Sequence, residues 1–414
     1  MGRSRKKYAA LSNESVEGTA WNELTPVAPF YLFVPQDRSL SAEYTEFPSL
    51  KEIFPVSVLG YQTHRDQFAI AFERSEIVAR LEKMRGKTPD SELHQHFGTE
   101  DNRDWNLATQ RARLKEDKSW KAPILKVAYR PFDWRWSYFS YVTMDFPRKE
   151  LLKHEAGREN LCINVTRQTK ASDWRHAVVT DVPAPAVFVE LKDGSTVFPL
   201  YLYDDEINGA NGDLFKGRHP NLSRIFLDEL AAKLGMQQEP RYGLPKGLTA
   251  EDIFHYIYAV FHAPGFRDRY ADSLKRDFPR APLTADRGLF HALARKGREL
   301  VALHLLNEEE APQINQFVTK FRKPGTNLVE EVEYDPGNRR VRINKEQYFE
   351  DVPAETWSFH IGGYQVCEKW LKDRKGRKLS YDDTQHWQRI VVALTETRRL
   401  MEEIDALIPA WPLR

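Results

Sequence analysis

The stretch from Trp357 to Leu379, WSFHIGGYQVCEKWLKDRKGRKL, joins two kinds of sequence. Its first half is aromatic and holds the paired glycines Gly362 and Gly363, which permit a positive φ or a close approach of the backbone to another surface. In its second half, seven residues, 372–378, hold five cations and one acid, Asp373; the cations are Lys372, Arg374, Lys375, Arg377 and Lys378. A tight backbone beside a cationic loop predicts contact with a polyanion.

Composition sets the limits of this prediction. The 414 residues are 41% hydrophobic and 29% charged, which is typical of a globular protein of two or three domains. Because the net charge is +1, any surface for DNA has to arise from local segregation of basic residues. Cys162 and Cys367 read as buried free thiols in a reducing cytoplasm. No run of 18 apolar residues occurs, so we expect a cytoplasmic chain that does not span a membrane.

The chain divides into three predicted parts. Residues 1–55 read as a connector with one short strand, Phe30–Val34, and suggest a partner domain upstream. Residues 56–205 form a mixed, β-rich part, and residues 206–414 a helical support with a hairpin, the basic loop and a long C-terminal helix. The predicted fold class is therefore α+β.

Individual elements follow from apolar spacing and turn signals. Strands are predicted at 124–129, 135–141, 161–165, 176–180, 186–190 and 196–203. Helices are predicted at 221–234, at 285–306, at 383–407 and after Thr249, which forms a capping box with Asp252. A hairpin is predicted around Asp335-Pro336-Gly337-Asn338. The aromatic cluster from Phe132 to Trp136 reads as core or as loop anchors.

Polar side chains at the ends of the central strands are candidates for contact with DNA. Arg and Gln can read guanine and adenine edges, while Lys and Arg also hold phosphates. A solvated surface is the alternative interpretation for each of them. The candidates are Arg148, Lys149, Arg167, Gln168, Lys170, Trp174 and Arg175.

Catalytic motifs are scarce. The chain has no Gly-rich phosphate loop, no Gly-x-Ser-x-Gly elbow, and no Asn/Asp-Pro-Pro-Tyr tetrapeptide of amino-methyltransferases. Asp181, Glu190 and Lys192 have the spacing of a metal-dependent nuclease, but this pattern is short and a strand followed by a turn is favoured. We therefore expect no catalytic activity and no cofactor in this chain.

Several longer stretches resemble one family. They are WNELTP at 21–26, PFYLFVPQD at 29–37, YRPFDWRWSYF at 129–139, DFPRKELLKHEAGRENLCINVTRQ at 145–168, VFPLYLY at 197–203, HYIYAVFHAPGFRDRYADSLKRDFPRAPLT at 255–284 and IGGYQVCEKWLKDRKGRKLSYDD at 361–383. Together they resemble the C-terminal specificity region of Type ISP restriction-modification enzymes. In these bacterial enzymes a nuclease, a translocase, an N6-adenine methyltransferase and a target recognition domain follow one another.

The resemblance implies a function as well as a fold. The chain would be an α+β module that selects a short asymmetric duplex site by major-groove contacts, with residues 1–55 joining it to the methyltransferase. Methylation with S-adenosylmethionine, and cleavage that needs ATP and Mg²⁺, would be carried out by upstream domains missing from these residues. The alternative is a subunit that only scaffolds a methyltransferase, with the last helix as its docking surface.

Overall fold

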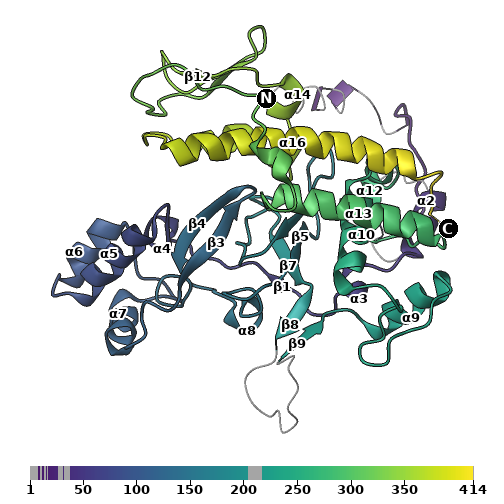
Figure 1. Ribbon diagram of the computed structural model, residues 1–414, viewed down its shortest axis with the longest axis horizontal. Helices are drawn as coiled ribbons and strands as arrows, with labels where there is room; N and C mark the ends of the chain where they lie inside the picture. Colours follow the sequence, from purple (N-terminus) through teal and green to yellow (C-terminus); the bar gives the residue numbers. More distant parts are fainter. Residues whose placement is uncertain are drawn as a thin grey trace. The chain divides into compact units, whose positions relative to one another are not determined.

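The computed structural model describes residues 8–9, 12–13, 15, 17–26, 31, 38–203 and 217–413 (Figure 1). Its contacts group the chain into two units, Met1–Glu43 and Tyr44–Arg414. Apart from Tyr31, the strand predicted at Phe30–Val34 lies outside the described residues. Among the described helices, none is long and apolar enough to cross a membrane. The predicted division at residues 55 and 205 stays a prediction.

Helix α2 (Arg38–Thr45) begins in the first unit and ends in the second. The second unit continues with the short helices α3 (Leu50–Ile53), α4 (Asp66–Ala69), α5 (Arg74–Arg85), α6 (Asp90–Phe97) and α7 (Leu107–Glu116). Strands β2 (Ile70–Ala71), β4 (Asp133–Tyr138) and β3 (Ile124–Arg130) pair in that order, all antiparallel. Apolar side chains of α5–α7 pack on this sheet as a satellite core that includes Trp105.

A second antiparallel sheet lies at the middle of the unit. Its order is β1 (Val58–Leu59), β7 (Ser195–Pro199), β5 (Cys162–Thr166) and β6 (Ala177–Thr180), and β8 (Tyr201–Tyr203) pairs with β9 (Arg218–Pro220). Helix α8 (Lys149–Leu152) precedes β5. The strand predicted at 186–190 is wrong: those residues form turns, since Pro183 and Pro185 remove two backbone donors just before them.

The helical part packs against this second sheet. It comprises α9 (Arg224–Lys233), α10 (Ala250–His262), α11 (Pro264–Arg269), α12 (Ala271–Leu274), α13 (Arg287–His304) and the 3₁₀ turn η1 (Pro312–Asn315). The predicted Thr249–Asp252 capping box is confirmed at the start of α10. Every residue of α10 except Glu251 and Asp252 is buried. Gly297 of α13 lies so close to α10 that an added Cβ would stand 1.8 Å from the His255 carbonyl oxygen.

The C-terminal part places a small sheet and a long helix over this core. The strands are β10 (Glu333–Asp335), β11 (Arg340–Arg342) and β12 (Tyr348–Phe349), followed by α14 (Ala354–Trp357), β13 (His360–Ile361), β14 (Tyr364–Gln365) and α15 (Val366–Lys372). Helix α16 (Tyr381–Leu407) runs alongside α13 in Figure 1 and confirms the predicted last helix. One hydrophobic core joins residues from Tyr44 to Leu413, and the α+β class is confirmed.

Candidate nucleic-acid interface

The basic loop, residues 372–378, connects α15 to α16 and is anchored by its backbone. Gly376 donates to the Val329 carbonyl at 2.8 Å, and Val329 donates in return to the Arg377 carbonyl at 2.9 Å. Lys372, Lys375, Arg377 and Lys378 are exposed, and Lys372 pairs with Glu368 at 2.9 Å. The loop therefore holds four exposed cationic side chains on a fixed backbone.

Arg374 differs from the other cations of this loop because it is buried, at 6% exposure. Its Nη2 donates to Asp133 Oδ1 at 3.1 Å, and its guanidinium stacks 3.3 Å from the centroid of the Trp370 ring. Its Nε lies 3.6 Å from Asp383 Oδ1. This side chain ties the basic loop to the β3–β4 hairpin and faces the protein rather than solvent.

Asp133 is the centre of a buried charge cluster. Its Oδ2 accepts from Arg135 Nη2 at 2.7 Å and from Arg135 Nε at 3.1 Å. Burial alone would raise the pKa of this carboxyl, but the guanidinium groups of Arg374 and Arg135 outweigh it and hold the pKa below its usual range. One ionised carboxylate between two arginines therefore joins strand β4 to the basic loop.

The paired glycines make the close approach that their sequence predicts. Gly362 has φ +54°, its N–H donates to the Arg175 carbonyl at 2.7 Å, and an added Cβ would stand 1.9 Å from the Val189 carbonyl oxygen. At Gly363 an added Cβ would stand 2.5 Å from the carboxylate of Glu190. The surface that the glycines approach is the chain's own segment around residues 175 and 189–190.

The central candidates lie at the ends of strands β5 and β6 and beside α8. Arg167, Gln168 and Lys170 are exposed in the loop after β5, where Arg167 Nε lies 3.0 Å from Asp277. Arg148 has φ +53°, and its guanidinium lies 4.8 Å from the Phe146 ring centroid. Lys149 begins α8.

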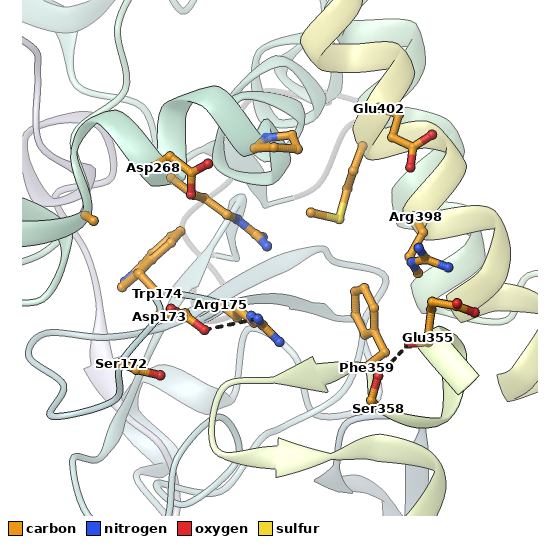
Figure 2. A pocket seen from close by; sticks show the side chains of 14 residues that line it. Ser172, Asp173, Trp174, Arg175, Asp268, Glu355, Ser358, Phe359, Arg398 and Glu402 are labelled. Carbon is orange, nitrogen blue, oxygen red and sulfur yellow. Dashed lines mark hydrogen bonds and ion pairs between the residues drawn. The ribbon is translucent and has the colours of Figure 1, made fainter. Parts of the chain in front are cut away.

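Trp174 and Arg175 lie apart from these exposed side chains. Trp174 is buried at 2% exposure, and Arg175 pairs with Asp173 at 3.1 Å (Figure 2). The two residues border a cavity of about 530 Å³ between the loop before β6, α11 and α16. Figure 2 shows Arg398 and Glu402 of α16 along one side of this cavity. Three arginines and four acidic residues line it, so it has no cationic surplus for a phosphate.

Two residues of the nuclease pattern, Glu190 and Lys192, lie in different surroundings. Glu190 lies 3.7 Å from the Nε2 of His176 and accepts from the Leu191 N–H at 2.9 Å, so it is engaged within the protein. Burial lowers the pKa of His176 to about 4, which keeps this imidazole neutral. Lys192 is exposed. In the part of the chain that the structure describes, no three His, Cys, Asp or Glu side chains are grouped to hold a metal ion.

Exposed cations on a packed α+β scaffold are a feature of nucleic-acid-binding modules. The family model for the Type ISP C-terminal specificity domain matches residues 52–403, and the chain belongs to this family. No curated protein sequence matches the chain. The family assignment identifies residues 52–403 as a specificity domain.

Solved structures share the fold. The cryo-EM structure of a DrdV–DNA complex matches with a TM-score of 0.70 and 21% identity over 98% of this chain and 42% of that chain. A nuclease-deletion mutant of the Type ISP restriction-modification enzyme LlaGI, in complex with a DNA substrate mimic, matches with a TM-score of 0.67 and 17% identity over 97% of this chain and 32% of that one. The ATP-dependent Type ISP restriction-modification enzyme LlaBIII bound to DNA matches with a TM-score of 0.64 and 17% identity, over 90% of this chain and 24% of that one. The chain thus spans less than half the length of each.

Proposed function

We propose that this chain binds duplex DNA and selects a short asymmetric sequence for a restriction-modification system. The observation that carries the proposal is the match of residues 52–403 to a Type ISP specificity domain. Three structural neighbours described as DNA complexes support DNA as the partner. The exposed cations of the basic loop give the partner a surface of suitable charge.

The two sets of exposed side chains have different tasks in this proposal. Lys375, Arg377 and Lys378 neutralise phosphates and set the register of the module on the duplex. In the loop after β5, Gln168 and Arg167 contact base edges in the major groove, where an amide or a guanidinium can make bidentate hydrogen bonds. Arg374 positions the basic loop through Asp133 and makes no contact with DNA.

The chemistry is assigned to other domains. We propose that an N6-adenine methyltransferase, on the same polypeptide or on a partner subunit, modifies the site that this module selects, using S-adenosylmethionine. The partial coverage of the longer Type ISP enzymes supports this arrangement. The present chain supplies the choice of sequence.

Selection from a randomised duplex pool tests the proposal. The purified chain is incubated with the pool at low and moderate salt, and bound sequences are recovered. We expect one asymmetric motif to be enriched. Loss of all enrichment and of all duplex binding, in a folded preparation, would contradict the proposal.

A salt titration tests the role of the basic loop. Lys375→Ala together with Lys378→Ala removes two exposed cations, and the slope of log K against log salt should fall by about 2. The matched control is Lys87→Ala with Lys118→Ala, which removes two exposed lysines from another surface. Equal slopes for the two double variants would show that the basic loop does not contact phosphates.

A further inference from the structure

A cleft of about 540 Å³ lies over the β3–β4 hairpin and beside the beginning of α16. We call it the hairpin cleft, and it is lined by aromatic and cationic side chains that include Phe72, Lys126, Trp134, Trp136, Trp370 and Arg377. His386 of α16 donates from Nε2 to the Phe132 carbonyl at 2.8 Å and so fixes α16 against the hairpin.

Strand alternation explains why two tryptophans face this cleft. In β4 the buried residues Asp133 and Arg135 alternate with the half-buried Trp134 and Trp136, so the two indoles share one face of the sheet. Lys126 of β3 lies directly across from Trp136 in the antiparallel register. The ammonium of Lys126 stands 5.9 Å from the Trp136 ring centroid. The face is therefore an aromatic pair with a cation beside it.

The opposite wall belongs to the basic loop and its neighbours. The Arg377 guanidinium stacks 3.9 Å from the centroid of the Phe72 ring, and the buried Trp370 ring stacks against Arg374. The exposed carboxylates of Asp181 and Asp382 also border the cleft. The hairpin cleft thus combines ring faces, two exposed cations and hydrogen-bond acceptors.

We propose that the hairpin cleft binds an unpaired nucleobase of a DNA strand. This inference rests on the proposed function, because it takes DNA as the partner. Aromatic faces flanked by cations stack bases of any sequence, while the cations hold the adjoining phosphates. Carboxylates accept hydrogen bonds from the exocyclic amino groups of cytosine and adenine. Because acids balance the cations, the cleft has no surplus charge for a phosphate alone, and the rings determine the ligand.

Fluorescence of 2-aminopurine tests this site with the full chain. The probe is placed in a single-stranded oligonucleotide, in the matched duplex, and in the free nucleoside. Stacking on an indole quenches its fluorescence, so we expect quenching with the single strand and little with the duplex. Trp136→Ala should weaken single-strand binding about 5- to 150-fold, the equivalent of one lost base–aromatic stack.

Three variants separate stacking from loss of fold. Trp136→Phe keeps an aromatic face and should retain most of the affinity, while Lys126→Gln, at an exposed position, should weaken binding with no change in the unfolding temperature. Tyr141→Ala removes an exposed ring outside the cleft and should change neither.

The outcomes distinguish this site from the proposed function. Single-strand binding without quenching, or equal quenching by the chain and by Trp136→Ala, would overturn the site. Quenching of the free nucleoside but not of the oligonucleotide would overturn the assignment to a DNA strand. Duplex binding without quenching of the probe would support the proposed function and contradict the site in the hairpin cleft. Quenching of the probe without duplex binding would support the site and contradict the proposed function.

Discussion

Asp133→Asn provides a direct test of how the basic loop is held. The asparagine keeps the shape of the side chain but removes the nearest counter-charge of Arg374 and Arg135, which lie 3.1 and 2.7 Å away. The next carboxylates, Asp383 and Asp373, are farther off, at 3.6 and 3.9 Å. Removing one partner from a buried ion pair costs about 3–5 kcal/mol, because the remaining charge stays buried. We expect the free energy of unfolding at pH 7 to fall by that amount, measured by urea titration with tryptophan fluorescence.

The chain holds a matched control for this variant. Asp173 and Arg175 have the same spacing along the sequence and a similar contact of 3.1 Å, but their side chains are 63% and 40% exposed. An exposed pair contributes about 0–1 kcal/mol. Asp173→Asn should therefore leave the urea midpoint nearly unchanged. Equal losses in the two variants would refute the argument from burial.

The pH dependence adds a second check. Because the folded pKa of Asp133 is depressed, its contribution to stability is complete above the unfolded pKa of about 4 and is lost as pH falls through the folded value. The difference between the wild-type chain and Asp133→Asn should then shrink in acid. A difference that stays constant down to pH 3 would contradict the ionised state of Asp133.

Three further outcomes follow from the structure. Gly362→Ala should lower the free energy of unfolding by about 3 kcal/mol or more, because the added Cβ would meet a backbone carbonyl. Gly376 has φ +82° and open space around it, so Gly376→Ala should lower the free energy of unfolding by only about 1–2 kcal/mol. Burial raises the pKa of Glu155 to about 8, so the folded state binds a proton that the unfolded state releases and stability falls as pH rises from about 4.5 to 8. Glu155→Gln removes this loss, and its advantage in urea titrations should be larger at pH 8 than at pH 5; an advantage independent of pH would argue against a protonated Glu155. Arg167→Ala should change the urea midpoint by less than about 1 kcal/mol, since its ion pair is exposed, but should weaken binding to the selected duplex.

Local signals predicted much of the fold. The capping box at Thr249, the apolar spacing of α16 and the Asp335–Asn338 turn depend on residues close in sequence, and each element formed where it was expected. The strand predicted at 186–190 did not form because two prolines, Pro183 and Pro185, precede its apolar run and a turn at residues 191–193 follows it. Pairing partners far along the chain override local β propensity.

The candidate site was less predictable because its details depend on distant partners. The sequence shows five cations near residue 375, but the burial of Arg374 follows from Asp133, which lies 241 positions away. The two indoles of the hairpin cleft had a readable signal, since Asp-Trp-Arg-Trp alternates in character as a strand does. That signal gives the shared face but not the cleft, whose other wall comes from the basic loop. The remaining DNA-contact candidates stay predictions.

The ion pair between Asp133 and Arg374 also affects the order in which the chain folds during synthesis. A ribosome synthesises the β3–β4 hairpin long before the basic loop. The nascent hairpin therefore carries Asp133 before Arg374, its partner 241 residues further along the chain, has been made. Closing so long a loop is entropically costly and comes late in folding. The hairpin therefore acquires its final form only when the C-terminus emerges, and a chain truncated before α15 leaves it incomplete.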